Sequence, residues 1–354
     1  MLIRFYYSKL DISMKEKNLP EISIIIPLYQ SEKTIANTIK SVIFQSFTDW
    51  ELLVIDDGST DNGAMIAKEF ADSDDRIKVF HQANSGRSAA RNKGIQLSQG
   101  NWIFFLDADD ALPTFALDTL FDCTNNVSAD LISGNRAGVR DLNRKRLEPS
   151  DTYIKAIANP WKTAKNNCDY YDGLIERAVW GKLYRATIIK NKKITFIPTL
   201  VFGEDALFNL LFLEAIEKVI IIDCGVYLYN DSEPSTTRSF DFSDIDHLEE
   251  FFEVGISVLN DLRKKNIIDK NDIAVFLINE LLVTFGRAVR WGKITRPMLK
   301  KFNYLVRKDS IKTIISQIDS PELLAYKSDW IYIKLFKCGR ADLAIMIGRF
   351  FQKI

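Results

Sequence analysis

Four short apolar runs alternate with helix-like segments in the first 110 residues, and this alternation is the strongest constraint on the fold. The runs cover residues 22–28, 51–55, 76–80 and 102–106. Near-continuous apolar runs of this length are typical of strands that are covered on both faces. Strands that alternate with helices predict a mainly parallel sheet with right-handed crossovers. We therefore expect an α/β domain in this part of the chain.

Carboxylates follow two of the four predicted strands. An Asp-Asp pair at 56–57 comes after the second strand, and Asp-Ala-Asp-Asp at 107–110 comes after the fourth. The carboxyl ends of parallel strands meet at one edge of the sheet, where α/β proteins bind ligands. Neighbouring carboxylates repel one another, and Mg²⁺ or Mn²⁺ relieves this repulsion while keeping open positions for phosphate oxygens. The pattern predicts a metal–diphosphate site, although an acidic surface turn explains either cluster taken alone.

Six motifs follow one another along residues 20–240. They are Ile-Ile-Ile-Pro-Leu-Tyr at 24–29, Val-Ile-Asp-Asp-Gly-Ser-Thr-Asp at 54–61, Asn-Ser-Gly-Arg-Ser-Ala-Ala-Arg-Asn-Lys-Gly at 84–94, Leu-Asp-Ala-Asp-Asp at 106–110, Val-Trp-Gly-Lys-Leu-Tyr-Arg at 179–185 and Phe-Gly-Glu-Asp at 202–205. In this order they resemble the motifs of family 2 glycosyltransferases, above all bacterial members that build capsule, exopolysaccharide or lipopolysaccharide. Those are inverting enzymes with the GT-A fold that use nucleotide-sugar donors. The resemblance implies a Rossmann-like, mainly parallel GT-A sheet flanked by helices.

The resemblance places the nucleotide against residues that follow the first two strands. Pro27, Leu28 and Tyr29 would form the wall of the nucleotide pocket, and Asp57 would accept a hydrogen bond from uracil or its ribose. Arg91 would orient the base and the diphosphate near a helix N-terminus, which itself attracts anions. The structural alternatives are a core tyrosine, a turn or helix cap built on the aspartates, and a solvated basic helix face.

The metal ligand and the catalytic base are also assigned from the resemblance and from the chemistry of sugar transfer. A Mn²⁺ or Mg²⁺ ion that bridges the phosphates stabilises the charge of the departing nucleoside diphosphate. Asp109 is the expected direct ligand. Asp107 contacts the ribose or the donor sugar, or reaches the metal through water, and Asp110 is the second choice. Asp205 is the expected general base for the acceptor hydroxyl, with Glu204 as its helper or as an acceptor contact. Carboxylates in a first helical turn also complement the helix dipole.

Three more residues complete the predicted site. Trp180 offers an aromatic face to an acceptor sugar, with a buried core tryptophan as the alternative, and Lys182 would reach the diphosphate. Arg238 lies in a loop that resembles the segment closing over the donor, and it would contact a phosphate. The chain has Asn230 and then Glu-Pro where many relatives have an arginine and a His-Pro or similar pair, so the role of Arg238 carries over less directly.

Composition argues against several other classes. Lys plus Arg and Asp plus Glu are equal at 47 each, so no net charge favours nucleic acid. The four cysteines are far apart, which predicts reduced thiols and neither a zinc site nor a redox pair. Two histidines are too few for a histidine-rich metal site. The sequence lacks a Gly-x-Gly-x-x-Gly motif after the first strand and a phosphate-loop motif, which argues against dehydrogenases and phosphate-loop NTPases.

The chain is predicted to divide into a leader at 1–20, a GT-A domain at 21–240 and a helical region at 241–354. Within the GT-A domain, a donor half at 21–113 precedes an acceptor half at 114–240. The leader lacks the long apolar core of a signal peptide. No apolar run reaches the length of a membrane span, which suits a cytoplasmic protein.

The last predicted helices, at 322–354, are basic and amphipathic. A segment of this kind can lie on an anionic lipid surface, which would give peripheral contact with the cytoplasmic face of the membrane. The alternative is that the segment packs against the catalytic domain or against a second subunit in a homodimer.

Together these features predict a metal-dependent inverting hexosyl- or N-acetylhexosaminyltransferase of bacterial surface polysaccharide assembly at the cell envelope. The donor is expected to be a UDP-sugar and the acceptor a glycan or lipid-linked glycan, with no nucleic-acid partner. The sugar and the linkage depend on a few loop residues and do not follow from the motifs. A nucleotidyltransferase and a non-catalytic sugar- or nucleotide-binding protein are the alternatives. The enzymatic assignment requires Asp57, Asp109 and Asp205 to share one cleft.

Overall fold

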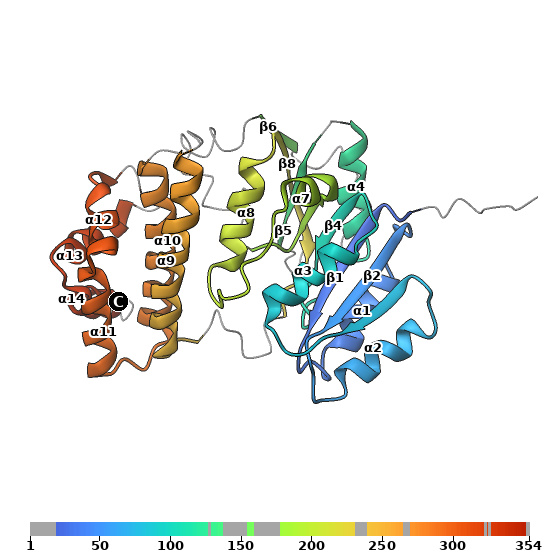
Figure 1. The fold of residues 1–354 in the computed structure, drawn as a ribbon, viewed down its shortest axis with the longest axis horizontal. Coiled ribbons are helices and arrows are strands. Elements are labelled where there is room, and N and C mark those ends of the chain that lie inside the picture. Colours follow the sequence, from blue (N-terminus) through green and yellow to red (C-terminus); the bar gives the residue numbers. More distant parts are fainter. Residues whose placement is uncertain are drawn as a thin grey trace, which may run out of the picture.

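The structure, a computed structural model, describes residues 19–126, 129–136, 154–158, 178–230, 239–264, 270–321, 324 and 327–351. Within these ranges an eight-stranded sheet occupies one side of the molecule and a group of helices occupies the other (Figure 1). The strand order is β3-β2-β1-β4-β7-β5-β8-β6. The predicted α/β class with C-terminal helices is confirmed.

The first four strands build the parallel part of the sheet. They are β1 (Ile22–Leu28), β2 (Trp50–Asp56), β3 (Ile77–His81) and β4 (Trp102–Phe105). β1 pairs in parallel with both β2 and β4, and β2 pairs in parallel with β3. The register places Leu28 beside Asp56 and Ile25 beside Phe105, so the chain leaves these strands at the same edge. The observed strand limits lie within one residue of the apolar runs.

The sheet continues into a mixed half. Its strands are β5 (Leu131–Arg136), β6 (Ile154–Ala158), β7 (Lys182–Arg185) and β8 (Lys218–Tyr227). β7 is antiparallel to both β4 and β5, β8 is parallel to β5, and β6 is antiparallel to β8 at the outer edge. Just after β8, Leu228 and Ala111 exchange two backbone hydrogen bonds. The end of β8 therefore lies beside the acidic segment that follows β4.

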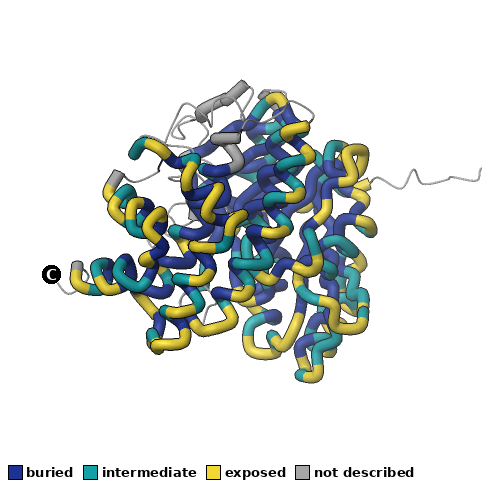
Figure 2. Tube along the Cα trace, turned by 60° about the vertical axis from the view of Figure 1, so that its left-hand side comes forward, coloured by how far each residue is buried: buried dark blue, intermediate teal, exposed yellow. Residues whose placement is uncertain are grey.

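Helices cover both faces of the sheet, and the strands between them are buried (Figure 2). Ile24 and Ile26 of β1 belong to the core on one face, and Ile25 belongs to the core on the other. This two-sided burial explains why the apolar run shows no polar alternation. Over the first face lie α1 (Ile35–Ile43), α2 (Gly63–Ala71) and α4 (Ala116–Asn126), and over the second lie α3 (Arg87–Leu97), α7 (Ala186–Lys192) and α8 (Glu204–Glu214).

Helix α3 approaches β1 closely. A Cβ atom at Gly94 would lie 2.3 Å from Cγ2 of Ile25, so the contact requires glycine at this position. Arg91 lies three residues earlier, and residues three apart share one side of a helix. The close contact therefore fixes how far Arg91 stands from the sheet.

Helix α8 lies between the sheet and the C-terminal helices (Figure 1). Phe208 and Phe212 pack in the core beside the sheet, whereas Leu207 and Leu210 pack in the core of the C-terminal helices. Gly203 precedes the helix with a φ of 74°, and a Cβ atom there would lie 2.5 Å from the Phe251 ring. The C-terminal helices thus determine where α8 begins.

The C-terminal helices share one hydrophobic core. They are α9 (Ser243–Lys264), α10 (Lys270–Trp291), α11 (Arg296–Arg307), α12 (Asp309–Gln317), α13 (Trp330–Lys337) and α14 (Ala341–Phe351). In the described part of the chain, none of the helices combines the length and the apolar character that crossing a bilayer requires. The predicted boundaries at residues 20, 113 and 240 stay predictions.

The basic segment 322–354 packs much of its apolar surface into this core. Ile333, Phe336 and Ile345 are no more than 1% exposed. Met346 and Phe350 lie outside the core and are 62% and 65% exposed. Packing within the chain accounts for the buried positions. Contact with a membrane or a second subunit stays a prediction for the exposed ones.

Candidate active site

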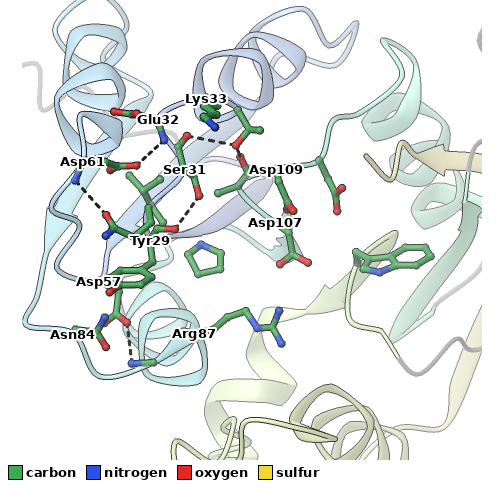
Figure 3. A pocket seen from close by; sticks show the side chains of 18 of the residues that line it. Tyr29, Ser31, Glu32, Lys33, Asp57, Asp61, Asn84, Arg87, Asp107 and Asp109 are labelled. Carbon is green, nitrogen blue, oxygen red and sulfur yellow. Dashed lines mark hydrogen bonds between the residues drawn. The ribbon is translucent and has the colours of Figure 1, made fainter. Parts of the chain in front are cut away.

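One pocket of about 790 Å³ opens at the carboxyl edge of the parallel strands, a volume typical of small-molecule sites. Asp57, Asp109 and Asp205 all line it, so the shared cleft that the sequence assignment requires is present. Figure 3 shows Asp57 and Asp109 on different walls, with Asp107 between Asp109 and Arg87. The lining residues are Pro27, Leu28, Tyr29, Gln30, Ser31, Glu32, Lys33, Thr34, Asp57, Asp61, Asn84, Gly86, Arg87, Asp107, Ala108, Asp109, Asp110, Ala178, Trp180, Asp205 and Tyr229.

The wall predicted to hold the nucleotide is made by the ends of β1 and β2. Pro27, Leu28 and Tyr29 all line the pocket, and Tyr29 is half exposed, so it is no core tyrosine. Asp57 is buried, and its carboxylate accepts hydrogen bonds from the backbone N–H groups of Ser85 and Gly86 at 2.9 and 2.8 Å. Asp57 therefore shapes the loop that leads into α3, which is the turn-building alternative, and it also faces the pocket.

Gln30 closes the turn between this wall and the segment after β2. Its φ of 50° is unusual for a residue other than glycine. The side-chain oxygen of Gln30 accepts hydrogen bonds from the N–H groups of Thr60 and Asp61 at 3.0 and 3.2 Å. Asp61 in turn accepts from the N–H of Glu32 at 2.8 Å (Figure 3). Sequence reasoning missed Gln30, because a turn joining two strand ends leaves no periodic signal.

The segment 107–110 presents its three carboxylates differently. Asp109 is exposed and Asp107 partly exposed on the pocket wall, whereas Asp110 is 3% exposed. Two threonines of the α1 region hold the back of the segment. Thr34 and Thr38 donate to the Ala108 carbonyl oxygen at 2.8 and 3.0 Å, and Thr38 also reaches the carbonyl oxygen of residue 110 at 2.7 Å.

The Asp110 carboxylate is occupied by two donors from the acceptor half. It accepts the Tyr227 hydroxyl at 2.7 Å and the backbone N–H of Asn230 at 2.8 Å. Burial raises the pKa of Asp110 to about 7, although these hydrogen bonds oppose the shift. A carboxylate held in this way supports its neighbours, and Asp109 remains the better placed of the two for a metal.

Arg91 joins the two ends of the predicted reaction site. Its guanidinium is fully buried and donates to Asp107 at 2.7 Å and to Asp205 at 2.6 Å. Burial opposes ionisation of Asp107, but the charges of Arg91 and Arg87 and the hydrogen bond from Arg91 outweigh it, so the pKa of Asp107 lies below its ordinary value. Arg91 is not among the residues that line the pocket, and its predicted role toward the base and the diphosphate stays a prediction.

Arg87, one helical turn earlier, stands in the pocket itself. Its side chain is 46% exposed, and its guanidinium pairs with the buried carboxylate of Glu204. Burial and the neighbouring Asp205 raise the pKa of Glu204, against the charges of Arg87 and Arg91. The two carboxylates at the start of α8 have different surroundings. Glu204 is 5% exposed and pairs with the arginines, whereas Asp205 faces the pocket.

Three other predicted residues have different surroundings. Trp180 lines the pocket, stacks on Tyr227 with ring centroids 4.7 Å apart, and has the Lys182 ammonium 5.8 Å from its ring centroid. Lys182 is fully buried, and its ammonium donates to the Ala178 carbonyl oxygen at 2.8 Å. The backbone of two pocket-lining residues, Ala178 and Trp180, accepts hydrogen bonds from Lys182, and its expected reach to a diphosphate stays a prediction. Arg238 lies outside the described residues.

The pocket carboxylates fit a metal that also binds substrate. Among the described residues, no group of three or more His, Cys, Asp or Glu side chains is arranged to hold a metal by itself. Mg²⁺ at phosphate sites is held by one or two carboxylates, with phosphates and water completing its coordination, and Mn²⁺ prefers the same oxygen donors. Asp109 and Asp107 offer such a pair beside space for a diphosphate.

Comparison with known proteins identifies the family. Residues 23–190 match the family described as Glycosyl transferase family 2. Residues 23–190 form a family 2 glycosyltransferase domain. The matched residues include β1 to β4 and the acidic segment after β4, so the resemblance inferred from the motifs and the enzyme class are both confirmed.

Several relatives of this domain come from bacteria. The chain is 26% identical to the uncharacterized glycosyltransferase EpsJ of Bacillus subtilis, over 95% of this chain and 96% of EpsJ. It is 32% identical to poly(ribitol-phosphate) beta-N-acetylglucosaminyltransferase TarP of Staphylococcus aureus, over 55% of this chain and 58% of TarP. The crystal structure of S. aureus TarS in complex with UDP-GlcNAc has the same fold, with a TM-score of 0.66, 18% identity and coverage of 94% and 92%.

Proposed function

We propose that this glycosyltransferase is metal-dependent and inverting, and that it moves a sugar from a UDP-sugar to a glycan or lipid-linked glycan in bacterial surface polysaccharide synthesis. One observation carries the proposal: the two amino groups of the buried Arg91 guanidinium hold Asp107 and Asp205, so donor-side and acceptor-side carboxylates share one pocket. The likeness to TarP, a poly(ribitol-phosphate) beta-N-acetylglucosaminyltransferase, supports a surface glycan as product.

The donor is proposed to lie along the wall made by β1 and β2. The uracil and ribose would rest between Tyr29 and Asp57, and the diphosphate would reach Asp109. TarS has been solved with UDP and with UDP-GlcNAc, and TarP is named as a β-N-acetylglucosaminyltransferase, which supports a UDP-N-acetylhexosamine as the first donor to test. A pocket of about 790 Å³ accommodates a ligand of this size.

Asp205 is proposed to remove the proton of the attacking acceptor hydroxyl. Its carboxylate faces the pocket with its side chain 22% exposed, and Arg91 fixes its orientation from behind. A divalent metal held by Asp109 and Asp107 would stabilise the negative charge on the leaving nucleoside diphosphate. Trp180 would support the acceptor ring from the pocket wall. Attack from the face opposite the leaving group inverts the anomeric carbon, so an α-linked donor gives a β-linked product.

A screen of nucleotide sugars tests the proposal directly. The purified chain is incubated with UDP-, GDP- and dTDP-sugars and MnCl₂, and released nucleoside diphosphate is measured with and without oligosaccharide acceptors. We expect slow release of UDP without acceptor and faster release with one, both abolished by EDTA. Release of pyrophosphate from a nucleoside triphosphate and a sugar phosphate would instead indicate a nucleotidyltransferase. Binding without any turnover would indicate a non-catalytic protein.

A cytoplasmic site of action follows from the proposed donor, because nucleotide sugars are made inside the cell. Peripheral membrane contact through 322–354 would bring the pocket near a lipid-linked acceptor. Met346 and Phe350 on α14 are the exposed apolar side chains that could enter a lipid interface. A second subunit on the same surface is the competing arrangement.

A further inference from the structure

Tyr227 links the donor and acceptor sides of the pocket through its hydroxyl and its ring. It is the last residue of β8 and is fully buried. The backbone N–H of Asp107 donates to the Tyr227 oxygen at 3.1 Å, and the Tyr227 hydroxyl donates to the Asp110 carboxylate at 2.7 Å. One oxygen atom therefore holds both ends of the segment that carries the proposed metal ligands.

The ring of Tyr227 makes the second link. It stacks on Trp180 with an interplanar angle of 20°. Trp180 forms an isolated β-bridge with Phe105 and lines the pocket. The orientation of the aromatic wall and the position of the acidic segment are thus set by the same side chain. Contacts from α1 and β1 do not hold the backbone N–H groups of the segment, because Thr34 and Thr38 bind only its carbonyl oxygens.

We propose that Tyr227 is a positioning residue that holds the Asp107–Asp110 segment in its metal-binding arrangement and keeps Trp180 in register with it. The inference rests on the proposed function for the identity of the ligand. It goes further by assigning a task to a residue that lines no part of the pocket. Asp107 N–H would otherwise have no acceptor among the hydrogen bonds of the described residues, so the start of the segment would lose its hydrogen bond to β8, while the Ala111–Leu228 pair still holds the end.

The test separates the Tyr227 hydroxyl from its ring. Tyr227→Phe keeps the stack on Trp180 and removes both hydroxyl contacts. We expect the dissociation constant of UDP measured with MnCl₂ to rise by about three- to thirtyfold, the range that follows from losing one or two hydrogen bonds. UDP affinity without metal should stay as in the wild type, because the nucleotide wall is untouched. Isothermal titration calorimetry of the full chain gives both constants.

Tyr184→Phe is the matched control. Tyr184 is equally buried, and its hydroxyl donates to Asn209 at 2.6 Å within the core. This variant should lose stability to a similar extent and keep the metal-dependent gain in UDP affinity. If Tyr227→Phe retains the full gain, or if Tyr184→Phe loses it equally, the positioning role is overturned.

Hydrogen exchange provides a readout that needs no ligand. Mass spectrometry of peptides covering 102–112 should show faster amide exchange in Tyr227→Phe than in the wild type or in Tyr184→Phe, because the Asp107 N–H loses its acceptor. Equal exchange in all three proteins would contradict the inference. If wild-type protein shows no metal-dependent UDP binding, the proposed function fails, and the exchange experiment still decides the structural link.

Discussion

The donor half and the C-terminal helices contribute to the same pocket in different ways. In the donor half, Asp57 and Asp109 stand within a few residues of strand ends, and parallel pairing of β1, β2 and β4 brings those ends to one edge. The described C-terminal helices place no residue on the pocket wall, yet they pack on α8, which carries Asp205. One half of the site follows from strand register, and the other half follows from packing over long sequence distances.

The largest effect should come from the base side. Asp205→Asn removes the proposed proton acceptor, so turnover should fall by roughly 10²- to 10⁴-fold. Donor affinity should stay nearly intact, because the nucleotide wall belongs to the donor half. Steady-state kinetics and UDP-sugar titration measure both quantities. Glu214→Gln, at the other end of α8, serves as a control with unchanged turnover. Near-normal turnover of Asp205→Asn would show that the base lies elsewhere.

Breaking the connection between the two halves should be the next largest effect. Arg91→Met leaves Asp107 and Asp205 without their buried partner, so the free energy of unfolding should fall by about 3 kcal/mol. Urea denaturation measures the loss. Arg76→Met provides a comparison at the more exposed pair with Asp74, where the change should stay under about 1 kcal/mol. Equal losses of unfolding free energy in the two variants would mean that the Arg91 ion pairs stabilise the protein no more than an exposed pair does.

The donor side should respond through metal affinity. Asp109→Asn removes a proposed ligand, and Mn²⁺-dependent UDP binding should weaken at least as much as the roughly 10- to 100-fold loss that follows removal of a ligand's supporting partner. Calorimetric titration in MnCl₂ measures it. Asp72→Asn, on the exposed end of α2, should bind as the wild type does. Unchanged metal dependence in Asp109→Asn would remove this residue from the metal site.

Two glycine substitutions, at 203 and 286, distinguish the effect of packing from the effect of chain flexibility on stability. Gly203→Ala puts a methyl group against Phe251 at a positive φ, so it should destabilise the protein by about 1–3 kcal/mol and lower turnover by moving α8. Gly286→Ala, in α10 with open space around it, should stabilise the protein by about 0.5–1 kcal/mol. Thermal unfolding of both variants decides the signs. Normal turnover of Gly203→Ala would show that packing of the C-terminal helices on α8 does not affect the site.

The smallest effect on the folded enzyme should come from the exposed face of α14. Replacing Met346 and Phe350 together by glutamate removes apolar surface that is outside the core, so turnover on a soluble acceptor should not change. Binding to vesicles that contain anionic lipid should decrease if this face meets the membrane. Unaltered co-sedimentation would end the membrane proposal and favour tests of self-association.

The sequence predicts most of the donor half and less of the rest, for a physical reason. Strand runs and acidic strand ends are local, so β1 to β4 and the shared edge could be predicted. The burial of Lys182 could not be predicted, because a motif does not state which face of a short strand its side chains occupy. The contacts of Tyr227 and Arg87 could not be predicted from the sequence, because their partners lie more than 100 residues away.

Arg91 has a practical consequence for redesign. Its single guanidinium is shared by a carboxylate from the nucleotide side and one from the sugar-accepting side. Replacing the first hundred residues with those of another enzyme, in order to change the donor, would also disturb Asp205, the proposed proton acceptor. The replacement would have to include both α3 and α8 to keep the Arg91–Asp205 contact. Loops at the opening of the pocket are a safer place for substitutions meant to change the donor sugar or the acceptor.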